Sequence, residues 1–135
     1  MIKFSLDECA FAPIKAHEDD AGWDLRTPHG FTLHDYESID LGVHIAIPQG
    51  YVGFLKSKSG LNVKHHITCE GVIDSGYTGS IVAKLYNHSN IPYTFDRGDK
   101  VVQLVILPIN TDQMVEVEKL EECERGSNGF GSSGK

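Results

Sequence analysis

The sequence predicts an all-β fold, a jelly-roll or β-clip-like sandwich with one short helix and a flexible C-terminal tail. Three observations favour it. Short runs rich in β-branched residues recur along the chain, several of these runs alternate with period two, and turn residues separate them at short spacing. At 135 residues and 40% hydrophobic content, the chain is long enough for one core and too short for two domains.

The N-terminal half is predicted to consist of strands joined by tight turns. Within Ala21–Thr27, Asp24 lies between a glycine turn and the start of a strand. Val43–Ile47 alternates between apolar and polar positions and stops at Pro48–Gly50, which is a turn signal. We therefore expect Tyr51–Leu55 to be the hairpin partner of the preceding strand.

The middle of the chain is predicted to contain the helix and two further strands. Ser59–Lys64 has room for a short helix, with Ser59 placed as its N-cap. Ile67–Ile73 and Ser80–Tyr86 are rich in β-branched residues, and the second of these runs alternates strictly. Period-two alternation is typical of a strand with one buried face.

The C-terminal part is predicted to form two strands, Val101–Ile109 and Met114–Val117, followed by a mobile arm. We place the sandwich domain at residues 1–120 and the arm at residues 121–135. The segment Arg125–Lys135 carries one arginine, one aromatic ring and two hydroxyls on a glycine-rich ribbon. Ordering such a ribbon costs roughly 1–2 kcal/mol per residue, which only new contacts offset, so its composition suits a flap that closes on a ligand.

Composition limits the partners and the compartment. Nineteen acidic against 12 basic residues give a net charge of −7, which argues against nucleic-acid binding and means that a phosphate ligand needs local cations or a metal. Three widely spaced cysteines without a C-x-x-C pair favour reduced thiols in the cytoplasm. Seven histidines lack metal-ligand spacing, and no apolar run is long enough to span a membrane, so we expect neither a histidine metal site nor a membrane partner.

Five segments place polar groups beside glycine turns. Lys56–Leu61 presents a cation, a hydroxyl and backbone N–H groups where the helix begins, which suits an anion. Gly71–Val82 is interpreted as a tight hairpin with a carboxylate and a phenol at its bend. With Ala21–Thr27, Gly98–Gln103 and the glycine-rich tail, in this order, these segments resemble the five motifs of the homotrimeric dUTPase family, over nearly the full chain.

The resemblance implies hydrolysis of dUTP to dUMP and pyrophosphate, with Mg²⁺ bound to the triphosphate. Such an activity keeps uracil out of DNA and supplies dUMP for dTMP synthesis. The family's enzymes are jelly-roll homotrimers in which each active site draws on more than one subunit. The dUTP substrate and a second and third copy of the chain are therefore the implied partners.

For the hairpin segment, the resemblance implies the base and the uracil site. Asp74 matches the family's general base, which deprotonates the attacking water. Tyr77 matches the residue whose ring lies against the deoxyribose and excludes a 2′-hydroxyl. The uracil slot, in which main-chain groups mimic base pairing, is matched by the hairpin backbone, namely Gly71, Val72, Ile73 and Val82.

For the phosphate side, the resemblance implies a cluster from three segments. Lys58, Ser59 and Gly60 match the phosphate-binding second motif, and Gln103 matches the phosphate-side amide of the fourth. Asp24 matches a carboxylate that approaches the metal through water, which suits the persistent hydration of Mg²⁺.

In the tail, the resemblance implies groups that close over the substrate. Arg125 matches an arginine directed at the phosphates and completes the catalytic set. Phe130 matches the ring that covers the uracil. Gly131, Ser132 and Ser133 lie where the terminal phosphate is held, so closure of the tail would expel water and complete the charge clamp.

Two positions depart from the family pattern. Lys58 stands where the second motif usually has arginine, and lysine lacks the bidentate fork, so affinity or metal dependence is expected to differ. Gly76 stands where relatives often have aspartate, which removes a charge near Asp74. Neither change removes a group that the reaction needs.

Two alternatives remain open from the sequence. A dCTP deaminase-like enzyme on the same scaffold would need an added acid or base near the pyrimidine, and Glu70 lies near Asp74 in the chain. A non-catalytic protein-binding module would keep the fold without the chemistry. The joint presence of Asp74, Tyr77, Arg125 and Phe130 favours the hydrolase over both.

Overall fold

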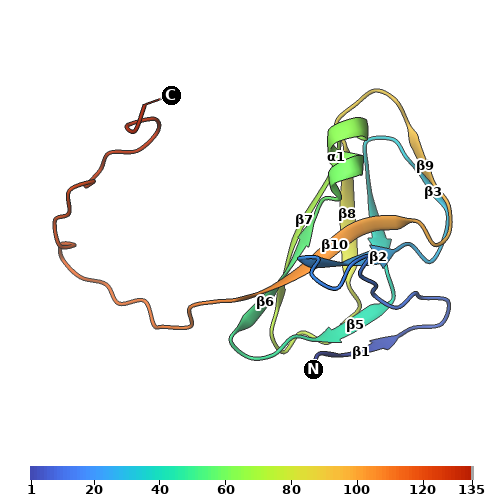
Figure 1. The fold of residues 1–135 in the computed structure, drawn as a ribbon, viewed down its shortest axis with the longest axis horizontal. Helices are drawn as coiled ribbons and strands as arrows, with labels where there is room; N and C mark the ends of the chain where they lie inside the picture. The colour runs from blue at the N-terminus through green and yellow to red at the C-terminus, as the bar shows by residue number, and fades with distance from the viewer. Residues whose placement is uncertain (135) are drawn as a thin grey trace.

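Residues 1–134 are described by a computed structural model of the chain and form ten β-strands and one short helix (Figure 1). In chain order the elements are β1 (Lys3–Leu6), β2 (Gly22–Arg26), β3 (Phe31–Leu33), β4 (Tyr36–Asp40), β5 (Val43–Ala46), β6 (Tyr51–Lys56), α1 (Ser59–His65), β7 (Ile67–Asp74), β8 (Val82–Asn87), β9 (Tyr93–Phe95) and β10 (Lys100–Pro108). The predicted all-β class with a single short helix is confirmed.

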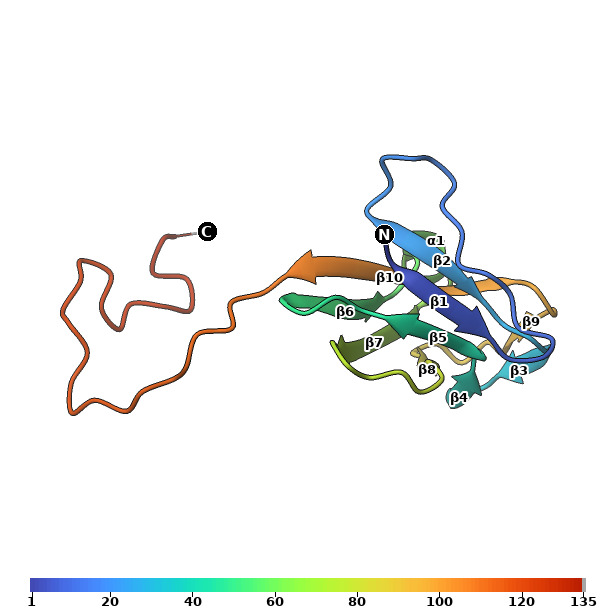
Figure 2. The ribbon, with the colours of Figure 1, turned by 90° about the horizontal axis from the view of Figure 1, so that it is seen from below.

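The strands form three antiparallel sheets that curl around one core. The largest has the order β2-β10-β6-β7-β8-β4, and two-stranded sheets are formed by β1 with β5 and by β3 with β9. The β1–β5 pair lies at one end of the body, and α1 with the β3–β9 pair lies at the other (Figure 1). Figure 2 shows the same sheets stacked against one another when the body is seen from below.

Period-two alternation places the core residues, as expected for strands with one buried face. In β8 and the residue before it, Ile81, Ala83 and Leu85 are buried, whereas Val82 and Lys84 are exposed. The strands predicted at residues 67–73, 80–86 and 101–109 are confirmed within one or two residues as β7, β8 and β10.

The predicted hairpin between residues 43–47 and 51–55 is wrong, although both strands are present. β5 pairs with β1, and β6 pairs with β10 and β7. The turn itself forms, because the Tyr51 N–H donates to the Pro48 carbonyl at 3.1 Å and Gly50 adopts φ 85°. Ile47 and Val52 on either side are both buried, so the turn carries the chain from one sheet to the next.

Two further expectations are corrected. Residues 114–117 form no strand, and Met114, Val115 and Val117 are all exposed, because this segment lies beyond β10 and pairs with no strand of the described chain. The N-cap of α1 is Lys58, without a side-chain cap bond, and Ser59 is the first helical residue. The helix therefore begins one residue earlier than it would with Ser59 as its cap.

Four strands were not predicted from the sequence, namely β1, β3, β4 and β9. They have only three to five residues, and most of their side chains are exposed or half-buried. Such short edge segments show too few apolar positions for a period to be recognised. Two of them nevertheless lead to contacts of the site described below, because Asp40 ends β4 and Asp7 follows β1.

After β10 the chain leaves the body. Ile109 still donates its N–H to the Gly50 carbonyl at 2.9 Å, but from residue 110 almost every side chain is exposed, and the segment projects away from the sheets (Figures 1 and 2). The division between a sandwich at 1–120 and a mobile arm at 121–135 stays a prediction, and Lys135 lies outside the described residues. In the described part of the chain, no helix has the length and apolar character needed to cross a membrane.

The three thiols form no disulfide among residues 1–134. Cys9 and Cys123 are exposed, whereas Cys69 is buried in β7. Burial raises the pKa of the Cys69 thiol to about 11, so this group stays protonated and packs as a small apolar side chain.

Candidate active site

The tip of the β7–β8 hairpin is splayed open rather than tight. The two strands pair only where Ile67–Cys69 lies opposite Leu85–Asn87. Beyond that point β7 stays paired with β6 as far as Asp74, whereas β8 continues beside β4. The predicted tight hairpin is thus wrong in shape, because each strand follows a different neighbour.

The opening between the separated strands is a pocket of about 250 Å³. Its walls include six of the residues predicted for the site: Gly71, Val72, Ile73, Asp74, Tyr77 and Val82. Sequence reasoning missed three further lining residues, Leu55, Ser80 and Ile81. Leu55 belongs to the neighbouring strand β6, so no local pattern in the hairpin could have indicated it.

Two glycines are fixed by close packing at this pocket. A Cβ at Gly71 would lie 3.2 Å from the Leu55 side chain, which faces it across β6 and β7. A Cβ at Gly79 would overlap the Tyr77 ring. Glycine therefore lets the backbone approach the Leu55 side chain at one position and the Tyr77 ring at the other.

Asp74 and Tyr77 are joined by one turn at the pocket mouth. The Tyr77 N–H donates to the Asp74 carbonyl at 3.2 Å, and Gly76 between them adopts φ 87°. The Tyr77 hydroxyl donates to the Ser80 carbonyl at 2.9 Å. The Asp74 carboxylate remains exposed, so solvent water reaches it.

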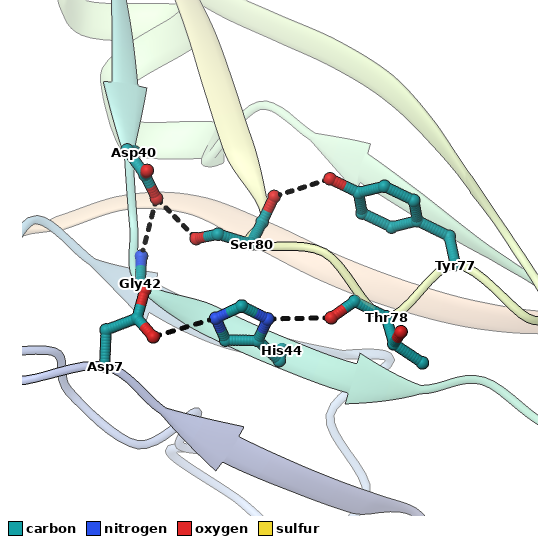
Figure 3. Close-up of polar contacts among 7 residues, drawn as sticks. All are labelled: Asp7, Asp40, Gly42, His44, Tyr77, Thr78 and Ser80. Atoms are coloured by element: carbon teal, nitrogen blue, oxygen red, sulfur yellow. Dashed lines mark hydrogen bonds and ion pairs between the residues drawn. The ribbon is translucent and has the colours of Figure 1, made fainter.

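The hairpin tip is tied to β4 and β5 by side-chain contacts (Figure 3). The Asp40 carboxylate accepts hydrogen bonds from the Ser80 hydroxyl and, at 3.0 Å, from the Gly42 N–H. These two bonds lower the pKa of Asp40. The His44 ring lies between the Thr78 carbonyl, at 2.7 Å, and the Asp7 carboxylate, at 3.0 Å.

A second cluster surrounds Asp24, in the middle of β2. One carboxylate oxygen is bonded to the Lys58 ammonium and the other lies 2.9 Å from Lys100 Nζ. Burial raises the pKa of Asp24, but the hydrogen bonds and charges of the two lysines outweigh burial and hold the pKa below its ordinary value. Lys100 is not among the predicted site residues, although it follows the glycine turn of the fourth segment.

The other phosphate-side residues lie beside this cluster. Gln103 pairs with Asp24 across β10 and β2, and its amide donates to the Ser57 carbonyl at 3.0 Å. Ser59 and Gly60 are the first two residues of α1, directly after Lys58, and both are exposed. The structure thus brings the predicted phosphate-side residues of the body together at one place.

Within one chain, this cluster is far from the hairpin pocket. Asp24 pairs with Gln103, which pairs with Lys56, which pairs with Glu70, and Asp74 lies four residues further along β7. Three interstrand steps of about 4.8 Å and four residues of about 3.3 Å give a separation of roughly 20 Å.

The tail residues form a third, separate group. Arg125 Nε donates to the Asn128 carbonyl at 2.9 Å, within the tail itself. Phe130 is fully exposed, and Gly131, Ser132 and Ser133 lie in the same projecting segment. The structure does not bring these residues to either cluster of the same chain.

The body offers no cage of protein ligands for a metal. Residues 1–134 contain no group of three or more His, Cys, Asp or Glu side chains that could hold an ion. Asp24 is the one carboxylate of its cluster, and both of its oxygens contact lysines. These residues fit a Mg²⁺ ion that arrives on a phosphate ligand and touches the protein through water, which is a common mode for this cation.

The fold and these clusters define a class: an antiparallel β-sandwich protein with a slot in a splayed hairpin and a separate cationic cluster. The sequence profile of the dUTPase family matches residues 9–134. The chain is 40% identical to a Gloeobacter violaceus deoxyuridine 5′-triphosphate nucleotidohydrolase, over 96% of this chain and 92% of the relative. The chain therefore belongs to the dUTPase family.

Solved structures agree with this assignment. A variant of the Staphylococcus bacteriophage 80alpha dUTPase with dUpNHpp is 31% identical, with a TM-score of 0.92 over 100% of this chain and 99% of the phage chain. A variant of the dUTPase from phage phi11 of S. aureus, described with a structural Mg(II) ion, is 30% identical with a TM-score of 0.84, over 90% of this chain and 99% of the phage chain.

Proposed function

We propose that this protein hydrolyses dUTP to dUMP and pyrophosphate, with Asp74 as the general base and Mg²⁺ on the triphosphate. The observation that carries the proposal is the splayed hairpin, which places Asp74 and Tyr77 at the mouth of one 250 Å³ pocket. The name of the bacterial relative and the dUpNHpp bound to a phage relative support dUTP as the substrate.

The pocket suits a pyrimidine because it has a free strand edge. β6 pairs with one edge of Gly71–Asp74, and beyond Cys69 the other edge has no partner strand within the described residues. Backbone N–H and C=O groups along that edge are available to a flat ring that carries donors and acceptors. Val72 and Val82 provide apolar walls, and a site built on hydrogen bonds strongly rejects a ring with a mismatched pattern.

Asp74 has the chemistry and the position for a base. A carboxylate that accepts a proton from water as the water attacks phosphorus is ordinary general-base catalysis. The Tyr77 ring, held one turn away by its bond to Ser80, forms the wall against which the sugar would lie. A ring in this position would exclude a 2′-hydroxyl, so the proposal includes discrimination against UTP.

The phosphates would lie at the lysine cluster. Lys58, Ser59, Gly60 and Gln103 supply a cation, a hydroxyl, backbone N–H groups and an amide, and Lys100 adds a second cation. When bound, Mg²⁺ would neutralise charge on the phosphate oxygens, with Asp24 contacting it through water. Arg125, Phe130, Gly131, Ser132 and Ser133 would then close over the nucleotide from the tail.

The separation of the clusters supports a shared site. A base at the attacked phosphorus and groups that bind the same triphosphate must lie much closer than roughly 20 Å, so one chain does not complete the site by itself. We therefore propose the homotrimer of the family, in which the hairpin, the lysine cluster and the tail of one site come from different subunits. Cytoplasmic dUMP supply for dTMP synthesis would be the cellular role.

A turnover assay with dUTP, dTTP, dCTP and UTP in the presence of Mg²⁺ tests the proposal. We expect pyrophosphate release from dUTP and at most about one hundredth of that rate from the other three. Ammonia release from dCTP would instead indicate the deaminase-like alternative. Absence of release from all four nucleotides would contradict the enzyme and favour a binding module.

A further inference from the structure

We propose that His44, in its doubly protonated form, is a positioning residue that holds the Tyr77 side of the pocket in place. Its ring joins Asp7, which follows β1, to Thr78 in the hairpin tip (Figure 3). The inference rests on the proposed function, because it assigns His44 to the pocket in which dUTP would bind.

The two contacts of His44 span separate parts of the chain. Nδ1 lies 2.7 Å from the Thr78 carbonyl oxygen, and Nε2 lies 3.0 Å from Asp7 Oδ1. Thr78 directly follows Tyr77, whose hydroxyl donates to Ser80 in the same tip. The hydrogen bond to the Thr78 carbonyl therefore restrains the position of the neighbouring Tyr77, which lines the pocket.

The chemistry of the partners determines the protonation state. A backbone carbonyl and a carboxylate are both acceptors, so both ring nitrogens must donate. A neutral imidazole carries one N–H and would leave one of its nitrogens facing an acceptor with no proton between them. Only the imidazolium satisfies both contacts at once.

Two carboxylates near the ring favour this state, and one lysine opposes it. Asp7 faces it from the segment after β1, Asp40 lies at the end of β4, and Lys3 of β1 lines the same shallow surface groove. The hydrogen bond to the Thr78 carbonyl, with the contact to Asp7, raises the pKa of His44 above 6.5. A raised pKa means that the bridge is complete below pH 6.5 and is lost as the pH rises through the folded value.

Loss of the bridge should affect one wall of the pocket more than the other. Asp74 is held by the pairing of β7 with β6, which does not involve His44. Tyr77 and Thr78 depend on contacts from β4 and β5, namely the Asp40–Ser80 bond and the His44 bridge. Release of His44 is therefore expected to weaken substrate binding while leaving the base in place, so KM should change more than kcat.

The first test uses NMR on the full chain without nucleotide, with ¹⁵N-labelled histidine. We expect the His44 ring to titrate above pH 6.5, and the Thr78 and Gly79 amide signals to move with the same midpoint. Asp7→Asn should lower that midpoint, since it removes the carboxylate and keeps an acceptor. A His44 ring that titrates at or below 6.5, or hairpin signals that do not follow it, would overturn the inference.

The second test measures KM and kcat for dUTP between pH 6 and pH 9. In the unmodified protein KM should rise across the His44 titration, whereas in His44→Gln it should be about three- to tenfold higher at pH 6 and flat, with kcat within about twofold. His34→Gln, which changes an exposed histidine in the β3–β4 turn, is the matched control and should behave like the unmodified protein.

The two proposals fail in different ways. If the unmodified protein releases no pyrophosphate at any pH, the proposed function fails, and the NMR titration still decides the role of His44. If dUTP is hydrolysed but His44→Gln shows the unmodified KM profile, His44 does not position the pocket and this inference is wrong.

Discussion

The body and the tail of this protein are built on opposite principles. In the body, each predicted site residue is held by pairing or packing: Asp74 by β6, Tyr77 by Ser80, and Asp24 by two lysines. In the tail, the contacts of Arg125 are local, and Phe130 has none of its ring covered. The site residues of the body are held in place before any ligand arrives, whereas Arg125 and Phe130 make no contact that fixes them against the body.

This difference has an energetic consequence. Preorganised groups cost no reorganisation when the substrate binds, so they suit the base and the slot that selects the ring. A segment that is ordered on binding spends part of its contact energy on lost chain entropy, but it can cover a ligand that has already entered. Changes in the body should thus alter chemistry or stability, and changes in the tail should alter activity alone.

The largest effect is expected from Asp74→Asn. The amide keeps the size of the side chain but cannot accept the water proton, so kcat for dUTP should fall about 10²- to 10⁴-fold while the nucleotide still binds. Pyrophosphate release gives kcat, and calorimetry with dUpNHpp gives binding. Glu37→Gln, an exposed change on β4, is the control. Unchanged turnover in Asp74→Asn would remove this residue as the base.

Deletion of the residues after Glu124 tests the role of the tail. It removes Arg125 and Phe130, and we expect kcat/KM to fall about 100-fold, because the charge clamp and the cover over the ring are lost. The unfolding temperature and the oligomeric state should not change, since the deleted segment supports none of the core. A truncated protein that unfolds or dissociates would show that the tail is structural.

Mixing the two variants tests whether the site is shared. A trimer that contains truncated subunits and Asp74→Asn subunits has some sites with an intact hairpin from one chain and an intact tail from another. Activity above that of either variant alone would support sharing, and the absence of any recovery would place hairpin and tail in the same chain.

A smaller effect is expected from Asp24→Asn, which leaves two ammonium groups without their counter-charge. We expect a loss of about 1–2 kcal/mol in the free energy of unfolding at pH 7, below the roughly 3–5 kcal/mol of a fully buried pair because Lys100 is 40% exposed. The lowered pKa of Asp24 stabilises the fold fully above pH 3.8, the ordinary pKa of the group, and this stabilisation is lost as the pH falls through the lower pKa of the folded state. Asp24→Asn should lack this acid-dependent loss.

Urea unfolding at pH 7 and pH 3.5 measures both effects. Glu70→Gln breaks the exposed pair with Lys56 and is the matched control, for which no measurable change is expected. Equal stability of Asp24→Asn and the unmodified protein at pH 7 would show that the lysine cluster does not hold β2 in place.

Sequence patterns predicted a strand correctly where the periodicity of that segment alone was sufficient. The alternation in residues 80–86 predicted β8 and its buried face, and the β-branched run at 101–109 predicted β10. The predictions were wrong where they depended on which other strand a segment pairs with. Residues 43–47 and 51–55 look like a hairpin but belong to different sheets, and Met114–Val117 looks like a strand but pairs with no other strand of the described chain.

Some residues of the candidate site could be predicted from the sequence, and others could be found only in the structure. Asp74, Tyr77 and Asp24 could be named from their place beside glycine turns and from the family resemblance. Leu55, Ser80, Lys100 and His44 could not, because each acts across strands that are distant in sequence.

By itself, the sequence determined the all-β class, the buried faces of the long strands and the order of the polar segments, because these follow from local periodicity and turn chemistry. The tertiary structure alone decided that the hairpin opens into a pocket, that Asp24 sits between two lysines, and that His44 joins two acceptors. The physical reason is that strand pairing and charge contacts join residues far apart in the chain, 14 positions for Lys56 with Glu70 and 76 positions for Asp24 with Lys100, and no local pattern encodes such distances.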